Sequence, residues 1–302
     1  MIEITSGSKY IDIDGYASCI AYAELLKSKG EDAKAITTTK EYSNSITKTL
    51  LSFKYKMEYK ENIKDKVIIL DICNPKMISN NVLKSKVIEV IDHHPYKESI
   101  DYWKERNVSL HLEEIGSICT IIYEKIKAEN KENILTKELC KLLIAGILDN
   151  SLNLKAKITK QRDINAFNDL MKIGSISPSF PLEYFKECQE AIESNLLENI
   201  ENDLKIDIYY SNIPRAFGQI LIVDIDSIMK RKKEILEYMN EKYPEWCINI
   251  ICLKDGKSYI LTSSSKIAEN MNKILKGNIK DKNLLELEHY LLRKEILMFA
   301  QS

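Results

Sequence analysis

A run of apolar and β-branched residues that ends in Asp-His-His-Pro constrains this chain more than any other stretch. Residues 87–91 read Val-Ile-Glu-Val-Ile, which predicts a buried strand, and the proline at position 95 stops it. Asp92, His93 and His94 are thereby delivered together to the carboxyl end of a strand, the edge where open α/β sheets bind ligands. The chain contains four histidines, and two of them are adjacent here. Because an ordinary polar loop can also hold two histidines, the interpretation depends on the residues at the ends of the other elements.

Other predicted elements also end in acidic residues. Asp12 and Asp14 lie between a short strand and the helix that follows it. Asp71 directly follows a second buried strand, and Asp149 lies near the end of an apolar helix. Capping of the first helix by Asp14 explains one of these aspartates. It explains the whole set, together with the histidine pair, less well.

These residue types point to a divalent metal ion held by oxygen and imidazole ligands. Without a thiolate among them, such ligands suit Mn²⁺, Mg²⁺ or Fe²⁺ better than a structural zinc ion. Enough carboxylates are present to bridge two ions. A two-ion site suits phosphoryl hydrolysis, because it can generate hydroxide and neutralise phosphate charge together.

The alternation of strands and helices predicts an α/β fold with a mainly parallel sheet flanked by helices. Residues 175–181 are rich in serine and proline and form the best linker, so we expect domains at 1–178 and 179–302, the second a smaller α/β domain. Expected strands of the first domain are 2–5, 33–37, 67–71, 87–92 and 108–112, and its helices are 17–27, 77–83, 118–126 and 135–152. Expected strands of the second are 206–210, 218–223, 247–253 and 258–262, and its helices are 182–204, 228–243, 267–275 and 284–292.

Composition excludes some classes of partner. The 44 Lys and Arg residues balance 45 Asp and Glu residues, which gives no overall attraction to long nucleic acid or to an anionic membrane. No apolar run approaches the roughly 18 residues that span a bilayer, and the first residues do not form a secretory signal, so we expect a cytoplasmic protein. The seven cysteines include no C-x-x-C pair and are expected to be buried thiols rather than disulfides or zinc ligands.

Five short motifs, taken in their order along the chain, resemble the DHH phosphoesterase superfamily across residues 1 to about 165. They are Asp12-Ile13-Asp14-Gly15, Ile69-Leu70-Asp71, Asp92-His93-His94, Gly116-Ser117 and Gly146-Ile147-Leu148-Asp149-Asn150-Ser151. The resemblance implies a site for two ions, Mn²⁺ or else Mg²⁺ or Co²⁺. Its ligands would be Asp12, Asp14, Asp71, His93 and either Asp149 or Asn150. It also implies that Asp71 bridges the ions, that His94 faces the phosphate or the leaving group, and that Asp92 orients an imidazole.

The second half of the chain resembles the DHH-associated domain of family II inorganic pyrophosphatases and exopolyphosphatases. The residues that carry this resemblance are Lys205, at the start of an expected strand, and Arg293 and Lys294 near the end. It implies that these cations bind phosphate across a cleft between the domains, where the active site lies. Branches that act on short oligonucleotides or cyclic dinucleotides carry a glycine-rich motif, whereas this chain has no Gly-Gly pair. A homodimer through the N-terminal domain is a further expectation.

Three positions depart from the family pattern. Ser8 stands where family II pyrophosphatases have a histidine ligand, and exopolyphosphatase-like members also lack that histidine. Asn150 aligns with a metal-binding aspartate, and Asp149 falls one residue early. Glu295 replaces a cation of the phosphate pocket. Each departure would weaken or alter activity.

The favoured function is a divalent-metal-dependent phosphohydrolase, exopolyphosphatase-like, that cleaves phosphoanhydride bonds of polyphosphate or pyrophosphate with a metal-activated hydroxide. Asp71 and His94 would be catalytic, and substrate would be bound by His94, Lys205, Arg293 and Lys294. One alternative is a phosphodiesterase on short oligonucleotides or cyclic dinucleotides. The other is a degenerate member that binds phosphorylated ligands or a protein partner without catalysis.

Overall fold

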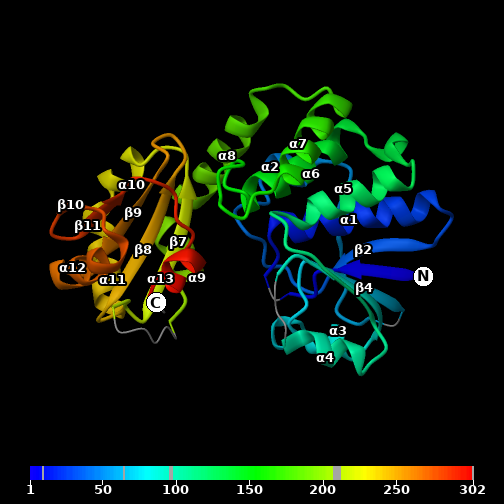
Figure 1. Ribbon diagram of the computed structural model, residues 1–302, viewed down its shortest axis with the longest axis horizontal. Helices are drawn as coiled ribbons and strands as arrows, with labels where there is room; N and C mark the ends of the chain where they lie inside the picture. Colours follow the sequence, from blue (N-terminus) through cyan, green and yellow to red (C-terminus); the bar gives the residue numbers. More distant parts are fainter. Residues whose placement is uncertain (9, 64, 95–97, 207–211, 301–302) are drawn as a thin grey trace. The chain divides into compact units, whose positions relative to one another are not determined.

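The computed structural model of the chain forms two compact units, Met1–Tyr184 and Phe185–Ser302 (Figure 1). It describes residues 1–302 except 9, 64, 95–97, 207–211 and 301–302, and for residues 98 and 294 it describes the backbone alone. The domain limits expected from the sequence, 1–178 and 179–302, stay a prediction.

The first unit is built on a six-stranded sheet in the order β3-β2-β1-β4-β5-β6. Every neighbouring pair is parallel, which confirms the predicted parallel sheet. The strands are β1 (Ile2–Thr5), β2 (Ala33–Thr37), β3 (Glu58–Tyr59), β4 (Lys66–Leu70), β5 (Lys86–Asp92) and β6 (Ser109–Leu112). The strand order reverses between β1 and β4, so the carboxyl ends of these strands form a switch point of the kind where open α/β sheets bind ligands.

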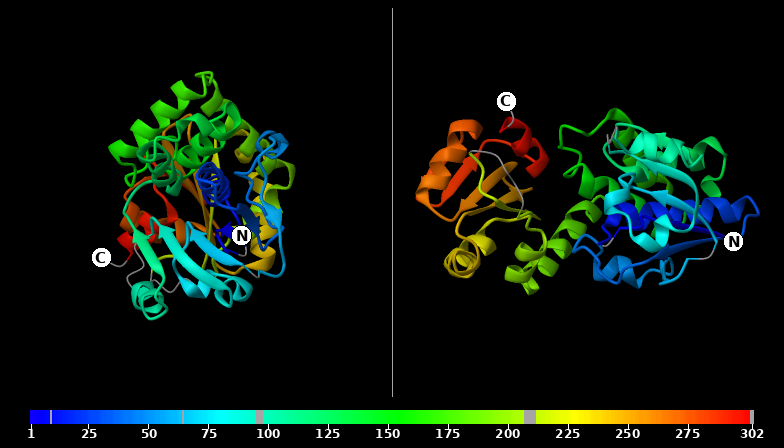
Figure 2. Two further views of the ribbon diagram at one scale, coloured as in Figure 1. Left: turned by 90° about the vertical axis from the view of Figure 1, so that its right-hand side faces the viewer. Right: turned by 90° about the horizontal axis from the view of Figure 1, so that it is seen from below.

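Helices cover both faces of this sheet (Figures 1 and 2). They are α1 (Ile13–Ser28), α2 (Lys48–Ser52), α3 (Asn80–Leu83), α4 (Glu98–Lys104), α5 (Ile118–Ala128), α6 (Lys137–Asn150), α7 (Gln161–Ile173) and the start of α8 (Phe180–Ser194), with short 3₁₀ turns at Pro75–Met77 and Glu132–Ile134. α1, α5 and α6 lie over one face, and α3 and α4 lie over the other. On the second face the buried Trp103 of α4 packs with Val67 and Val90 of the sheet, which joins helix and strands in one apolar core.

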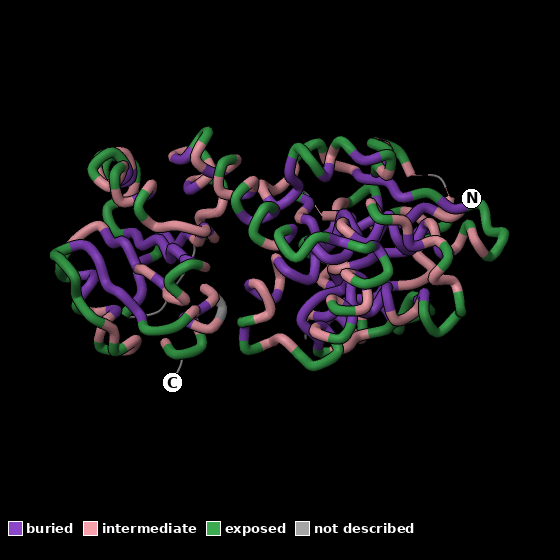
Figure 3. Tube along the Cα trace, turned by 90° about the horizontal axis from the view of Figure 1, so that it is seen from above, coloured by how far each residue is buried: buried purple, intermediate pink, exposed green. Residues whose placement is uncertain are grey.

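The second unit has a five-stranded mixed sheet in the order β10-β11-β9-β8-β7. Only β7 and β8 are parallel to each other among the described pairs. Its elements are α9 (Leu196–Asn202), β7 (Ala216–Ile222), α10 (Asp226–Lys230), α11 (Lys232–Lys242), β8 (Trp246–Cys252), β9 (Lys257–Thr262), α12 (Ser265–Leu275), β10 (Asn278–Asp281), β11 (Leu284–Leu287) and α13 (Arg293–Phe299). One apolar cluster joins the sheet to α9, α10 and α11, and another joins it to α12 and α13. The sheet is therefore covered on both faces (Figure 3). Strands β8 and β11 are buried along their whole length, whereas the edge strand β10 is exposed.

The helix expected at 284–292 is wrong. Residues Leu284–Leu287 form strand β11 instead, which pairs with β9 on one side and β10 on the other. Leucine and glutamate favour helices, but a segment enclosed by two strands and two apolar layers follows the sheet, because tertiary packing overrides a propensity of a few tenths of a kcal/mol. The helix in this region, α13, begins only at Arg293.

Other differences concern breaks and omissions. The helix expected at 182–204 is two helices, α8 and α9, and the one expected at 228–243 is broken at Arg231 between α10 and α11. Helices α4 and α7 and strands β3 and β10 were not expected, and the strand expected at 206–210 falls mostly outside the described residues. All seven cysteines are buried, as predicted. Among the described helices, none combines the length and the apolar character that crossing a membrane requires.

Candidate metal centre

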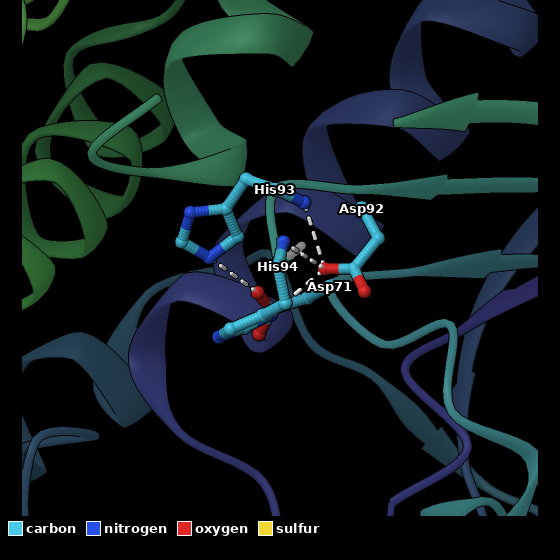
Figure 4. Close-up of side chains that lie close together, drawn as sticks. All are labelled: Asp71, Asp92, His93 and His94. Carbon is cyan, nitrogen blue, oxygen red and sulfur yellow. Dashed lines mark hydrogen bonds and ion pairs between the residues drawn. The ribbon is translucent and has the colours of Figure 1, made fainter. Parts of the chain in front are cut away.

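The carboxyl ends of β4 and β5 bring an aspartate and the Asp-His-His triplet together. Asp71 follows β4 with a φ of 70°, a left-handed conformation that aspartate tolerates better than most residues. Its backbone N–H donates to the carbonyl oxygen of Ile91 on β5 at 3.0 Å, which fixes this turn. One potential ligand atom from each of Asp71, Asp92, His93 and His94 lies within 4.8 Å of the others (Figure 4). This group is the only one of its kind within the described part of the chain.

His93 presents a lone pair to carboxylate oxygens. Its Nδ1 lies 3.0 Å from the carbonyl oxygen of Ile115. A carbonyl only accepts, so Nδ1 carries the hydrogen and Nε2 is left as an acceptor. Nε2 faces Oδ1 of Asp71 at 3.1 Å and Oδ2 of Asp14 at 3.7 Å. Among the described residues, His93 Nε2 and Asp71 Oδ1 are buried without a hydrogen-bond partner. Two acceptors held together in this way need a cation, so these residues fit a divalent metal ion.

Asp92 holds His94 rather than His93. Its Oδ1 accepts hydrogen bonds from the backbone N–H groups of His93 at 2.7 Å and His94 at 3.1 Å, and it lies 2.8 Å from Nδ1 of His94. Burial works against the charged imidazole, but the hydrogen bond to Asp92 and the nearby Asp71 carboxylate raise the pKa of His94. Burial likewise disfavours the Asp92 carboxylate, yet the contacts with His94 keep the pKa of Asp92 below its usual value. The imidazole of His94 is therefore oriented and biased toward its charged form.

The two aspartates at the start of α1 differ from the expected arrangement. Asp12, not Asp14, is the N-cap of α1, because Asp12 Oδ1 accepts from the backbone N–H of Gly15 at 3.0 Å. Asp14 lies in the first turn, is fully buried and turns its carboxylate to the start of α5. There it also accepts a hydrogen bond from the side-chain amide of Asn150. The capping of α1 by Asp14 that sequence alone suggested is wrong.

Four carboxyl groups repel one another in this region, those of Asp12, Asp14, Asp71 and Asp149. Burial first, and then the charges of Asp12 and Asp14, raise the pKa of Asp71 well above its ordinary value. Burial and the charge of Asp14 raise the pKa of Asp12. Burial and the charge of Asp12 raise the pKa of Asp149 to about 7, although the Tyr184 hydroxyl donates to its Oδ1 at 3.3 Å. A bound cation would relieve this repulsion.

Ser8 is occupied by its own loop. Its hydroxyl donates to the carbonyl oxygen of Tyr10 at 2.7 Å and lies 3.1 Å from the hydroxyl of Ser6. The side chain expected to replace a histidine ligand therefore already has partners. Serine is a poor metal ligand in any case, because its neutral hydroxyl brings no charge to the ion.

The cations of the second unit are gathered around Arg293. Its Nη1 donates to the carboxylate of Asp203 at 2.7 Å and to the carbonyl oxygens of Asp203 at 2.8 Å and Phe217 at 2.9 Å. Lys205 pairs its backbone with that of Phe217, and burial together with the charge of Arg293 lowers the pKa of Lys205. The side chain of Lys294 lies outside the described residues. Glu295 accepts from the backbone N–H of Leu292 at 2.8 Å and so caps its own helix.

Comparison with known proteins identifies the family of the N-terminal part. Residues 4–147 match the model of the DHH family, N-terminal domain. These residues therefore form a domain of the DHH family. A manganese-dependent inorganic pyrophosphatase of Methanothrix thermoacetophila is 23% identical over 305 residues, which cover 98% of this chain and 96% of that protein.

Two solved structures share the fold. A candidate family II inorganic pyrophosphatase of Methanococcus jannaschii superposes with a TM-score of 0.68 at 18% identity, with both chains fully covered. An exopolyphosphatase-related protein of Bacteroides fragilis gives a TM-score of 0.54 at 15% identity, over 99% of this chain and 90% of that one.

The first unit also contains polar residues that sequence reasoning did not find. Asp163, fully buried on α7, accepts from the backbone N–H of Gly116 at 3.0 Å and from the Thr120 hydroxyl at 2.6 Å, and so holds the start of α5. The single signal for it was an acidic residue in the first turn of a helix. Tyr184 contacts Asp149 from a different helix, and no local pattern announces that contact.

Proposed function

We propose that this chain is a divalent-metal-dependent phosphohydrolase that cleaves phosphoanhydride bonds of polyphosphate or pyrophosphate in an exopolyphosphatase-like reaction. The observation that supports it most is the buried pair of acceptors, His93 Nε2 and Asp71 Oδ1, 3.1 Å apart and next to further carboxylates. Buried acceptors in contact make sense as ligands of a cation. The full-length relative named as manganese-dependent adds support for Mn²⁺, with Mg²⁺ or Co²⁺ as substitutes.

Metal ions bound by Asp71, His93 and their carboxylate neighbours would offset phosphate charge and lower the pKa of the attacking water. The chain itself supplies the proton for the leaving group. His94 is held through Nδ1 by Asp92 at 2.8 Å, so Nε2 would give its proton to the bridging oxygen as the phosphorus–oxygen bond breaks. The raised pKa of His94 keeps that proton available near neutral pH.

Cations of the second unit would bind the remaining negative oxygens of the substrate. Arg293 suits this role because its Nη1 is fixed by three acceptors, which orients the planar guanidinium before substrate arrives. Lys205 and Lys294 would add positive charge, although an ammonium group lacks the planar set of donors of a guanidinium. A fixed arginine accompanied by lysines is suited to a substrate that carries several phosphate charges.

The test is phosphate release from pyrophosphate, tripolyphosphate and a long polyphosphate, compared side by side with Mn²⁺ or Mg²⁺. Asp71→Ala removes the carboxylate closest to His93 and is expected to abolish turnover. Asp32→Ala is the matched control, since this aspartate is 76% exposed and is expected to leave turnover unchanged. Full activity of Asp71→Ala, or no release from any of the three substrates by the wild type, would contradict the proposal. A dinucleotide in the same assay covers the phosphodiesterase alternative.

Two observations favour a second candidate, a non-catalytic member that binds phosphorylated ligands. The Ser8 hydroxyl is engaged by its own loop, and the Asn150 amide is engaged by Asp14. Both positions would be metal ligands in a fully equipped site, as the family resemblance implies. If this candidate is correct, the double change Ser8→His and Asn150→Asp creates phosphate release that the wild type lacks. A wild type that is already active excludes it.

A further inference from the structure

We propose that Asn150 withdraws Asp14 from metal binding, so that the site holds one divalent ion tightly instead of two. The inference rests on the proposed metal site and concerns how many ions that site accepts. It depends on which carboxylate and imidazole atoms are already satisfied by the protein.

All of the acceptor capacity of Asp14 is used inside the protein. Its Oδ1 accepts from the hydroxyl of Ser117 at 2.6 Å and from the backbone N–H of Cys119 at 3.0 Å. Its Oδ2 accepts from the backbone N–H of Ile118 at 3.0 Å and from the side-chain amide of Asn150. A carboxylate offers about four lone-pair positions, and four donors fill them. The start of α5 also stabilises the negative charge, so Asp14 is satisfied without a metal ion.

The side-chain amide of Asn150 is the donor that occupies the last open position of Asp14 Oδ2. This oxygen is the one that faces His93 Nε2, at 3.7 Å. The backbone donors of α5 are present whatever residue stands at position 150, whereas the amide is not. An aspartate at this position could not donate, and its carboxylate beside that of Asp14 would require a cation between them. The amide hydrogen of Asn150 therefore stands where an ion would otherwise be needed.

Apart from Asp92, whose Oδ2 also lacks a hydrogen-bond partner but whose other oxygen holds His94, four side chains have an unsatisfied ligand atom among the described residues of the candidate site. Asp12 and Asp149 each have one carboxylate oxygen in a hydrogen bond, with Gly15 and Tyr184 respectively, which leaves the other oxygen open. Asp71 Oδ1 and His93 Nε2 have no hydrogen-bond partner in the described part of the chain. Asp71 and His93 belong to the group whose ligand atoms lie within 4.8 Å of one another, so a first ion would be held there. Even with Asp71 bridging two ions, the second ion would have as protein ligands only that shared carboxylate and the open oxygens of Asp12 and Asp149, which favours one tight ion.

The experiment counts bound Mn²⁺ directly, by calorimetric titration and by electron paramagnetic resonance of the same samples. For the wild type we expect one tight ion per chain. Asn150→Asp is expected to bind a second ion ~10–100-fold more tightly than the wild type does, the range seen when groups around a metal site are changed. Its resonance spectrum should show a coupled manganese pair that the wild type lacks. Asn150→Ser, which removes the amide without adding charge, should give a smaller gain and serves if Asn150→Asp folds poorly.

Asn165→Asp is the control for added charge. Asn165 is exposed on α7, and its Oδ1 accepts from the Gln161 amide at 3.0 Å, a contact that aspartate can keep. This variant should bind one ion, like the wild type. The inference is overturned if the wild type binds two ions of similar affinity, if it binds none, or if both position-150 variants stay at one. Phosphate release is measured on the same preparations: one bound ion without any release would refute the proposed function and leave the ion count standing.

Discussion

Removal of the buried Asp163 carboxylate is expected to destabilise the first unit more than any surface change. Asp163 is fully buried and accepts from the backbone N–H groups of Gly116 at 3.0 Å and Lys160 at 2.8 Å, and from the Thr120 hydroxyl at 2.6 Å. Asp163→Ala leaves the buried N–H of Gly116 and the part-buried N–H of Lys160 without an acceptor, at ~1–3 kcal/mol each, and the hydroxyl of Thr120 can rotate to another partner. We therefore expect a loss of ~4 kcal/mol, a large share of the ~5–15 kcal/mol that holds a typical domain folded.

The assay is thermal and urea unfolding of the metal-free protein, with Asp163→Asn as the matched variant. The asparagine carbonyl oxygen can still accept from both N–H groups, so its loss should be ~1 kcal/mol. For a domain of this size ~4 kcal/mol corresponds to a fall in Tm of ~8–16 °C. Gly116→Ala is an independent check, because a Cβ there would lie 2.6 Å from Asp163 Oδ2. Equal effects of Asp163→Ala and Asp163→Asn, or a loss below ~1 kcal/mol, would refute the reasoning.

Two further predictions concern the charges of the candidate site. The folded-state pKa of Asp149 is raised from 3.8 to about 7, and those of Asp12 and Asp71 are also raised, so their stabilising effect is fully present below pH 4 and is lost as pH rises toward 7. The free energy of unfolding, followed by thermal melting of the metal-free protein, should therefore fall between pH 5 and pH 8 by up to ~3 kcal/mol for Asp149 alone, and saturating Mn²⁺ should remove the fall. Asp203→Ala removes the carboxylate that holds Nη1 of Arg293. We expect KM for tripolyphosphate to rise roughly tenfold, the effect of losing one charge-assisted hydrogen bond, with kcat nearly unchanged. Steady-state kinetics measures both constants, and an unchanged KM contradicts the prediction.

The sheet of the first unit could be predicted because its strands are continuous apolar runs that stop at a polar residue. Residues 67–70 and 87–91 need no knowledge of their neighbours to read as buried parallel strands. The stretch 284–287 lacks such a signature, since Leu-Leu-Glu-Leu fits a helix or a strand equally well. Its pairing with β9 and β10 decides the matter, and those partners are set by the tertiary structure. Prediction from a single sequence therefore failed where the choice lay outside the segment itself.

The composition of the candidate site could be predicted for a similar reason. The carboxyl ends of parallel neighbours lie at one edge of a sheet, so Asp71 and His93 had to approach each other once β4 and β5 were recognised. The hydrogen bonds of Asp14 could not be predicted, because its donors lie more than one hundred residues away along the chain. The choice of Asp12 as N-cap depended on the exact residue at which α1 begins, and such boundaries are the least predictable feature of a helix.

The neighbours Asp149 and Asn150 show how one residue of register can change a site. Both lie at the end of α6, where consecutive side chains point about 100° apart. Asp149 accordingly contacts Tyr184 and is repelled by Asp12, whereas Asn150 donates to Asp14. A carboxylate at position 149 therefore cannot replace one at position 150, because helix geometry aims the two at different groups. Exchanging the two residues would leave the composition of the chain unchanged. With asparagine at position 150, Asp14 is paired with an amide, whereas with aspartate there it would face another carboxylate.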